Sequence, residues 1–446
     1  MIDFLIIGAD AAGLSAAVQI KQKKPDADIL VIEKNDIISY AACGMPYVIS
    51  GEVSSPESLI HFTPESFKKK RGIEVKTRVE AIDVFPEEHS IEIRDLAEGR
   101  SEKMNYKKLM IATGASPKKL PFIDYSLEGV FNFHQIPDLN AVLEYFDNHK
   151  PKTAAIIGAG NIGLELTEVL KKRGVDVYLF ELFPEPAYLW PPLIREACKK
   201  KIKEKNINFF PGKSIKNVEK KEGKFVLETD PGEYKVDIVF SVVGSSPATK
   251  FCKDKIAQTD RGAIVIDRTG QTSNEDIYAA GDCATVYHKI LDKQVYFPLG
   301  GTANKMGRVA GLTMAGEKIY YPGIVGTQIF KFFELSLAKT GLCINEIEDQ
   351  GRGFREYSAM RKDKAGYYPH ALPVKVKIMV DDQSDEIIGA AVVSEENAAQ
   401  FIDAAAVAVF NKMKVQELGW FDSAYAPPYA PVWNALVSAA LKAVKT

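Results

Sequence analysis

The chain has 446 residues, of which 46% are hydrophobic and 26% are charged, and its formal net charge is -2. These values are typical of a soluble globular protein with two or three domains, and they give no reason to expect nucleic acid or an acidic membrane surface as a partner. The longest apolar runs are too short to cross a bilayer, so no membrane association is expected.

Five cysteines are scattered along the chain without a CxxC pair or a His-rich cluster. A metal site and a disulfide framework are therefore not expected. An odd, sparse cysteine count suits a reducing compartment, and the first residues lead directly into a strand pattern rather than a signal peptide. These features predict a cytoplasmic protein.

The first 33 residues show the pattern of a dinucleotide-binding unit. Phe4–Ile7 predicts a short buried strand, and a Gly-rich turn follows it and leads into an Ala-rich helix that ends near Lys23. A second strand, Ile29–Ile32, ends at Glu33, whose carboxylate can accept hydrogen bonds from a ribose diol. The turn that would face the pyrophosphate consists of Gly8, Ala9, Asp10, Ala11, Ala12 and Gly13. Asp10 stands at the second glycine position, where an acid is unfavourable unless its side chain turns away.

The segment Ser39–Tyr47 holds one cysteine, Cys43, with no second cysteine nearby. Gly44 and Pro46 predict a turn into a helix, because proline is tolerated in a first helical turn. A thiol at a helix N-terminus is expected to have a lowered pKa and to favour the reactive thiolate. The alternative is a small buried cysteine in a Gly/Pro turn, and the presence of two phosphate-binding loops favours the reactive thiol.

Residues 48–105 predict helices followed by short strands, with a helix over Pro64–Lys70. The charge run Lys68–Arg71 at the end of this helix is either a solvated face that complements the helix dipole or a patch that contacts the phosphate of a nucleotide-like substrate. A strand that starts at Tyr106 ends in the turn Thr113–Gly114 and returns the chain to a second domain.

A second dinucleotide unit begins at Ala154–Ile157 and contains a complete GxGxxG, Gly158–Gly163. A helix over Leu164–Lys172 and a strand over Val175–Phe180 follow, and the strand ends at Glu181. An acid at this position repels a 2′-phosphate, so this site should prefer NADH over NADPH.

Beyond the second unit, a strand ends at Gly281–Asp282 and a helix is expected to start at Cys283. Asp282 could accept a hydrogen bond from a polyol such as ribityl, or it could cap that helix. From about Gly326 the pattern changes to a third, α+β domain without a nucleotide loop. Its two predicted helices cover Glu396–Lys412 and Val432–Lys445, and Ala424–Tyr429 is either a packed turn or a dimer contact.

Two dinucleotide sites and one isolated thiol suggest an electron relay from a nicotinamide to a flavin and then to sulfur. The order of these motifs resembles the single-cysteine branch of the pyridine nucleotide–disulfide oxidoreductases. The most similar members are the coenzyme A–disulfide reductases, with NADH oxidases and NAD(P)H sulfur or persulfide reductases as relatives. The resemblance implies FAD in the first site, NAD(P)H in the second with NADH preferred, and a homodimer formed through the C-terminal domain.

The implied fold class is α/β, with two Rossmann-like dinucleotide-binding domains for FAD and NAD and a C-terminal α+β dimerisation domain. The FAD-binding domain would be discontinuous, over 1–115 and 247–325, with the NAD(P)H-binding domain at 116–246 and the dimerisation domain at 326–446. The resemblance also permits a coenzyme A moiety bound to Cys43.

The resemblance carries four groups of site residues, which we take as expectations. The implied catalytic residues are Cys43, Tyr367, Tyr368 and Tyr425, the last from the partner subunit. Besides the first loop, the implied FAD contacts are Glu33, Lys34, Ser39, Cys43, Ala112, Thr113, Gly114, Gly281, Asp282, Pro298, Leu299, Gly300, Thr302 and Tyr425. The implied NAD contacts are Gly158, Gly160, Asn161, Ile162, Gly163, Glu165, Glu181, Val243 and Gly244. The implied substrate contacts are Ser15, Gln19, Gln22, Ser39, Ala42, Arg71 and Asn304.

The implied activity is reduction of coenzyme A disulfide, or of a coenzyme A persulfide or polysulfide, through Cys43. Ala11 stands where the oxidases and peroxidases of this family carry a histidine, which disfavours an NADH oxidase that uses oxygen. Gln22, Ala42 and Trp433 replace a basic residue, an amide and a lysine that contact coenzyme A in the reductases. The sulfur acceptor therefore stays open, and an NADH oxidase or a slow-turnover flavoprotein sensor that binds NADH remains an alternative.

Overall fold

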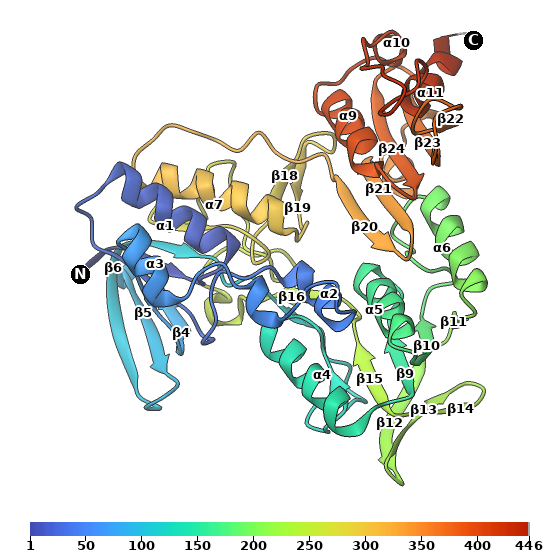
Figure 1. Cartoon of the computed structure of the whole chain (residues 1–446). Coiled ribbons are helices and arrows are strands. Elements are labelled where there is room, and N and C mark those ends of the chain that lie inside the picture. The colour runs from blue at the N-terminus through green and yellow to red at the C-terminus, as the bar shows by residue number, and fades with distance from the viewer. Residues whose placement is uncertain (445–446) are drawn as a thin grey trace.

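The computed structural model describes residues 1–444, which form three regions that are each built on a β-sheet (Figure 1). The first region contains a seven-stranded sheet whose parallel part has the order β3-β2-β1-β6-β17. These strands are β1 (Ile2–Ile7), β2 (Ile29–Ile32), β3 (Glu74–Lys76), β6 (Ser101–Ile111) and β17 (Ile277–Ala279). All four side chains of β2 are buried, as expected for a parallel strand covered on both faces. An antiparallel extension adds β4 (Val79–Phe85) and β5 (Ser90–Asp95) beside the first half of β6.

Two helices from distant parts of the chain cover this sheet together. Helix α1 (Ala11–Lys23) follows the first Gly-rich loop, and α7 (Gly300–Met314) lies beside it (Figure 1). A Cβ on Gly307 would lie 2.2 Å from the carbonyl oxygen of Ala12, and one on Gly311 would lie 2.5 Å from that of Ala16. The helices can approach this closely only because both positions of α7 are glycine.

The second region repeats the same parallel arrangement, with the order β11-β10-β9-β15-β8. Its strands are β8 (Val130–Phe131), β9 (Thr153–Ile157), β10 (Asp176–Glu181), β11 (Asn208–Pro211) and β15 (Ile238–Ser241). The helices of this region are α4 (Ile136–His149), α5 (Asn161–Lys172) and α6 (Pro192–Glu204), and a three-stranded meander is formed by β12 (Ile215–Lys221), β13 (Lys224–Thr229) and β14 (Glu233–Val236). The two connections to the first region pair as β7 (Ala115–Pro117) and β16 (Ser245–Pro247).

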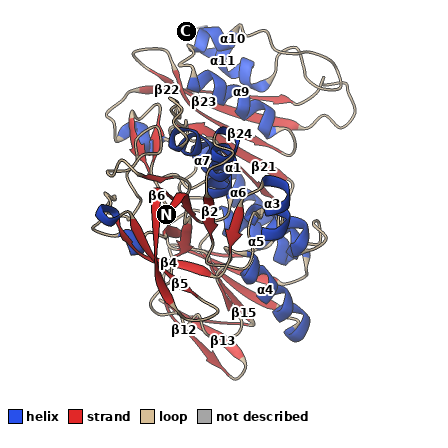
Figure 2. Ribbon diagram, turned by 90° about the vertical axis from the view of Figure 1, so that its left-hand side faces the viewer, coloured by secondary structure: helices blue, strands red, loops and turns tan. Residues whose placement is uncertain are grey.

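The third region is a five-stranded antiparallel sheet of order β20-β21-β24-β23-β22. Its strands are β20 (Gln328–Phe332), β21 (Leu335–Gly341), β22 (Phe354–Lys362), β23 (Pro373–Asp381) and β24 (Ile387–Ser394). The helices α9 (Ala398–Phe410), α10 (Val415–Gly419) and α11 (Ala435–Val444) gather beside these strands (Figure 2). The hairpin β20–β21 reaches from this domain to the second region, where β20 contacts α5.

Most expected elements form close to their predicted positions, and one does not. No helix starts at Cys283, because the chain turns there and enters the short strand β18 (Val286–His288). The last helix ends at Val444 in the structure, and the predicted end at Lys445 lies outside the described residues. Within 1–444, no helix has the length and apolar character needed to cross a bilayer, and no three His, Cys, Asp or Glu side chains gather as a metal-binding group.

Candidate active site between two dinucleotide loops

The two Gly-rich loops have nearly the same geometry. Gly8 and Gly158 adopt φ values of +106° and +107°, which only glycine adopts without strain. A Cβ on Gly13 would lie 1.9 Å from the carbonyl oxygen of Gly8, and a Cβ on Gly163 would lie equally close to that of Gly158. Each loop therefore requires glycine at its first and last positions, and each leads directly into a helix whose N-terminus can face a phosphate.

An acidic side chain supports each loop from the end of the neighbouring strand. The Glu33 carboxylate accepts a hydrogen bond from the backbone N–H of Ala9 at 2.9 Å, and Glu181 accepts the corresponding bond from Ala159 at 2.7 Å. The two carboxylates thus hold the loop and the strand end together. They lie where the ribose of a bound dinucleotide would be expected.

Four glycines beside the two loops border open space, which leaves room for a bound dinucleotide. A Cβ placed on Gly114 or Gly300 would meet no atom within 4 Å, and the same is true of Gly160 and Gly244 beside the second loop. Since these glycines lie at the carboxyl ends of parallel strands or at the start of a helix, the residues present fit FAD at the first loop and NAD at the second.

The remaining cofactor residues expected from the sequence lie around these two openings. Ala112 and Thr113 follow the end of β6, and Pro298, Leu299 and Thr302 surround the start of α7. In the second region Asn161, Ile162 and Glu165 lie in the first turns of α5, and Val243 follows β15. The Lys34 ammonium pairs with Glu80 at 2.6 Å, and Ser39 N–H donates to the Ala9 carbonyl at 3.0 Å.

Asp10 and Asp282 are both half-buried carboxylates in the first site. Burial, together with the nearby Glu33 and Asp282 carboxylates, raises the pKa of Asp10 to about 7, although a hydrogen bond from the backbone of Tyr40 opposes this rise. The side chain of Asp10 is therefore directed to backbone N–H groups. Burial also raises the pKa of Asp282, whose carboxylate accepts a hydrogen bond from the backbone of Leu299 at the start of α7 rather than capping a helix of its own.

The Cys43 side chain is exposed to solvent and lies in a short 3-10 turn, Ala42–Gly44, directly before α2 (Met45–Ile49). The turn into a helix was predicted correctly, but the predicted lowering of its thiol pKa is wrong. Partial desolvation and the Glu165 and Asp282 carboxylates raise the pKa of Cys43. Their influence outweighs that of a helix of only five residues, whose dipole is small.

Cys43 therefore lies where elements from both nucleotide regions meet. Asp10 and Asp282 of the first site and Glu165 of the second all influence the Cys43 thiol. Burial and the neighbouring Glu168 raise the pKa of Glu165 to about 7. Helix α2 contacts both α4 and α5, so this segment bridges the two regions.

Glu168 is a residue that sequence reasoning missed. Its side chain is 3% exposed, and its carboxylate accepts hydrogen bonds from Lys331 and from the backbone N–H of Phe333 at 2.5 Å. Lys172 lies 2.8 Å from the same carboxylate and 2.6 Å from Glu52, which follows α2. Glu168 thus joins α5 to the hairpin β20–β21, and no local sequence pattern marked it, because its partners Lys331 and Phe333 lie far along the chain.

The predicted substrate residues are only partly grouped. Ser15 on α1 donates a hydrogen bond to Asn304 on α7 at 2.9 Å, and Gln22 and Arg71 are exposed at the ends of α1 and α3 (Pro64–Arg71). Gln19 is buried, so its side chain is less accessible than the others.

The predicted tyrosines lie in the C-terminal domain, away from the edge of its sheet that contacts α5. Tyr367 and Tyr368 are in the loop between β22 and β23, at the opposite edge of the sheet from β20, which contacts α5. Four inter-strand spacings separate these edges, about 19 Å. Tyr425 is also exposed, and it shares a hydrogen bond with the Tyr367 hydroxyl.

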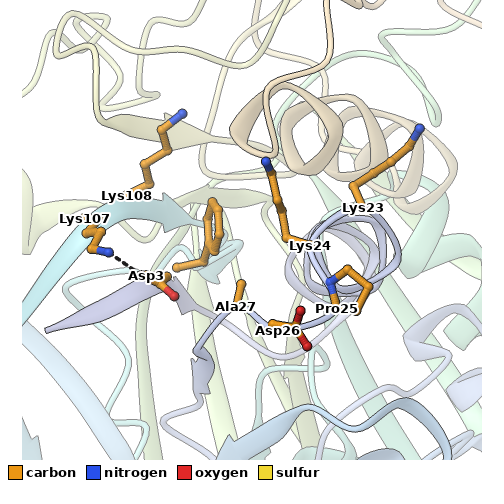
Figure 3. Close-up of a pocket in the computed structure, with 9 residues that line it drawn as sticks. Asp3, Lys23, Lys24, Pro25, Asp26, Ala27, Lys107 and Lys108 are labelled. Atoms are coloured by element: carbon orange, nitrogen blue, oxygen red, sulfur yellow. Dashed lines mark ion pairs between the residues drawn. The ribbon is translucent and has the colours of Figure 1, made fainter.

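A surface hollow of about 490 Å³ lies outside this region (Figure 3). It is lined near the start of β1 by Phe4, by the lysines that end α1, and by Lys107, which pairs with Asp3 at 2.7 Å. Ligands of open α/β sheets bind at the carboxyl ends of the strands, so this hollow is separate from the dinucleotide sites.

Comparison with known proteins gives a consistent family. Residues 2–307 match the family described as pyridine nucleotide-disulphide oxidoreductase, and residues 327–436 match its dimerisation domain. The CoA-dependent NAD(P)H sulfur oxidoreductase of Pyrococcus furiosus is 36% identical over 437 residues, which cover 97% of each chain. The NADH oxidase of Methanocaldococcus jannaschii is 34% identical over 444 residues, which cover 99% of this chain and 98% of that one. A solved NAD-dependent persulfide reductase from A. fulgidus has a TM-score of 0.95 and 31% identity, covering 100% of this chain and 83% of that chain.

These matches confirm the predicted α/β fold with Rossmann-type domains and a C-terminal dimerisation domain. They also confirm the predicted cofactors, since FAD and NAD(P)H are the cofactors of this family, and the predicted enzyme class of flavoprotein disulfide reductase. Two open glycine loops on either side of a single exposed thiol agree with that chemistry. The chain belongs to the pyridine nucleotide-disulphide oxidoreductase family.

Proposed function

We propose that this protein uses NADH and FAD to reduce coenzyme A disulfide, or a coenzyme A persulfide or polysulfide, through Cys43. The observation that carries this proposal is the isolation of the Cys43 thiol. All five cysteines are free; Cys198, Cys252 and Cys283 are buried, and Cys343 is half-buried at the end of β21. Cys43 therefore needs an external sulfur to form a disulfide, which is what a low-molecular-weight disulfide or persulfide supplies.

We assign each cofactor and each step of the proposed reaction to residues of the site. When bound, the flavin supplies two-electron transfer between a nicotinamide and sulfur. The first loop with Glu33 and Asp282 would hold FAD, and the second loop with Glu165 and Glu181 would hold NADH. Two electrons and one proton open a mixed disulfide at Cys43, so that one thiol leaves and the Cys43 thiolate remains to attack the next disulfide.

The names of the relatives support this substrate class. The Pyrococcus furiosus relative is named as CoA-dependent, and a relative from Staphylococcus haemolyticus, 29% identical over 429 residues, is named coenzyme A disulfide reductase. In this chain we propose that Ser15, Asn304 and Arg71 contact the acceptor, with Gln19, Gln22, Ser39 and Ala42 around them. Arg71 is one of four exposed cations in the last turn of α3, and of these Lys68 forms an ion pair with Glu74 at 3.3 Å.

We also propose a homodimer in which the tyrosines act on the partner's site. Trp420, Tyr429 and Trp433 are exposed and lie within ten residues of Tyr425 in the sequence, and exposed aromatic side chains of this kind are often covered by protein interfaces. Tyr425 of the partner subunit would donate a proton to the leaving thiolate, with Tyr367 or Tyr368 beside it. We further propose that the FAD-binding domain covers 1–115 and 247–325, the NAD(P)H-binding domain 116–246, and the dimerisation domain 326–446.

Replacement of Cys43 by serine tests the proposal. The Cys43→Ser variant should keep FAD bound and should lose NADH-dependent reduction of both coenzyme A disulfide and coenzyme A persulfide. If the variant reduces either acceptor at the parental rate, Cys43 is not the redox thiol.

A second candidate is an NADH oxidase, because the Methanocaldococcus jannaschii relative carries that name. The test measures oxygen and NADH consumption by the unmodified enzyme while sulfur acceptors are present. Equal consumption of the two would favour the oxidase.

A further inference from the structure

One carboxylate in the C-terminal domain is completely buried at the base of the loop that carries Tyr367 and Tyr368. Asp363 follows the end of β22 and has 0% exposure. Its backbone N–H donates to the Leu372 carbonyl at 2.9 Å, and its Oδ1 accepts from the Leu372 N–H at 2.8 Å. Leu372 directly precedes β23, so these two bonds close the loop 363–372 at its base.

The other carboxylate oxygen fastens this base to a helix. Asp363 Oδ2 accepts a hydrogen bond from Asn397 Nδ2 at 3.1 Å, and Lys364 Nζ lies 3.4 Å from the same oxygen. Asn397 immediately precedes α9 and has a φ of +61°, a conformation that asparagine tolerates better than most residues. The loop base is thus fixed to the rigid layer of helices rather than only to its own strands.

The same loop holds the segment that carries Tyr425. The backbone N–H of Ala365 donates to the carbonyl of Pro427 at 3.1 Å, and the Tyr367 and Tyr425 hydroxyls share a hydrogen bond. Tyr429 N–H in turn donates to the Ala426 carbonyl at 2.9 Å, which closes a turn in this second segment. The two tyrosine-bearing segments are therefore joined to each other and, through Asp363, to α9.

We propose that Asp363 is a positioning residue that sets the place of Tyr367 and Tyr425 for the partner subunit's Cys43 site. This inference rests on the proposed function, in which those tyrosines act across the dimer. A buried carboxylate is a poor stabiliser compared with an apolar residue of the same size, so its role is expected in fixing one geometry. Every bond to Asp363 restrains the tyrosine loop or its anchor.

The Asp363→Asn variant removes the acceptor that faces Asn397. Its new amide group would point a donor at the Asn397 amide donor, so the anchor to α9 would be lost while the bond from Leu372 N–H could remain. In the holoenzyme we expect faster hydrogen exchange in both 363–372 and 424–431. We also expect kcat for coenzyme A disulfide or persulfide to fall by about 10- to 100-fold, with KM for NADH unchanged.

The exchanged pair provides the rescue. In the double variant Asp363→Asn with Asn397→Asp, the amide donates and the carboxylate accepts, so the anchor is restored with the roles reversed. Both hydrogen exchange and kcat should return to within about threefold of the parental values. If the single variant leaves exchange in 424–431 unchanged, or if the double variant does not recover, the proposal is overturned.

Asp381 is the matched control. It is also a buried carboxylate, 6% exposed, and it accepts hydrogen bonds from Arg352 at 2.7 Å and from the backbone of Ser384 at 2.9 Å. It lies at the opposite end of the β22–β23 pair, because the register places Phe354 opposite Asp381 and Lys362 opposite Pro373. The Asp381→Asn variant should lose stability without changing exchange at 424–431; an equal loss of kcat in both variants would indicate a merely structural role.

Mixed dimers test the action across subunits. One subunit carries Cys43→Ser and the other Asp363→Asn, so the only intact Cys43 faces the intact tyrosine loop of its partner. Action across the dimer predicts half of the parental activity, whereas action within one subunit predicts half of the Asp363→Asn activity. If the parental enzyme reduces neither acceptor, the proposed function fails, and the exchange measurements on both Asp363 variants still decide whether Asp363 anchors the two tyrosine segments.

Discussion

The carboxylate of Glu181 accepts a hydrogen bond from the backbone N–H of Ala159, 2.7 Å away, and this bond fixes a negative charge beside the second Gly-rich loop. A 2′-phosphate would meet that charge, and the next side chain, Leu182, is exposed and apolar. The paired change Glu181→Ala and Leu182→Arg should raise the ratio of kcat/KM for NADPH to that for NADH by about 10- to 100-fold. Steady-state rates with each coenzyme measure this ratio.

The Glu181→Gln variant is the control for loop geometry. Its amide oxygen can still accept the Ala159 N–H, but the charge is gone, so the preference for NADH should weaken while the loop stays in place. An unchanged coenzyme ratio in the paired variant would mean that this loop does not bind the adenosine end of the nicotinamide coenzyme.

The stability of the cofactor-free protein should depend on pH through Asp10. Burial raises its pKa in the folded state to about 7, whereas the unfolded value is about 3.9. The contribution of this group is therefore present below pH about 4 and is lost as the pH rises through about 7. The free energy of unfolding of Asp10→Asn, measured by urea denaturation, should equal that of the parent near pH 4. At pH 8 it should exceed that of the parent by up to about 4 kcal/mol. If the difference in free energy of unfolding between the variant and the parent is the same at pH 4 and at pH 8, this expectation is contradicted.

Glu168 joins the hairpin β20–β21 to α5, and Glu334 joins the same hairpin to α6. The two carboxylates should contribute differently to the free energy of unfolding. Glu168 is 3% exposed, so its replacement by glutamine leaves Lys331 and Lys172 without a buried counter-charge and should cost about 2 to 3 kcal/mol. Glu334 pairs with Lys201 at 2.5 Å but is 39% exposed, and water screens this pair, so Glu334→Gln should cost less than about 1 kcal/mol. Denaturant titration of both variants gives the comparison, and equal losses would show that burial does not set the difference.

Gly307 is a position where the addition of one methyl group should be destabilising. Alanine is favoured over glycine in a helix by about 1 kcal/mol, but its Cβ would lie 2.2 Å from the backbone oxygen of Ala12. Gly307→Ala should therefore lower the free energy of unfolding by about 2 kcal/mol or more. In Gly366→Ala the added Cβ meets no atom within 4 Å, so a change within about 1 kcal/mol is expected there.

The nucleotide loops could be read from the sequence because their requirements are local. A positive φ at Gly8 and a Cβ-free position at Gly13 arise within six residues, and the strand, turn and helix around them follow the same short-range rules. The second loop repeats these rules, so the structure forms both Gly-rich turns at the predicted residues.

The errors arose where distant residues decide the outcome. The thiol pKa of Cys43 was expected to be low from its own turn, but Glu165 and Asp282 approach it from later parts of the chain and raise it. The helix expected at Cys283 forms instead at Gly300, where it can pack against α1. Asp363 and Glu168 gave no local signal, since their partners are brought to them only by the folded sheets.

The packing of α7 on α1 also determines the order in which the chain can fold during synthesis. The ribosome releases β1, α1 and β6 first, but β17 and α7, which complete the same sheet and helix pair, emerge only after the entire second sheet. Domains usually form in the order in which they leave the ribosome. Here the amino-terminal domain is finished after its neighbour, so a nascent chain that stalls before residue 300 exposes the bare alanine face of α1 to chaperones and proteases.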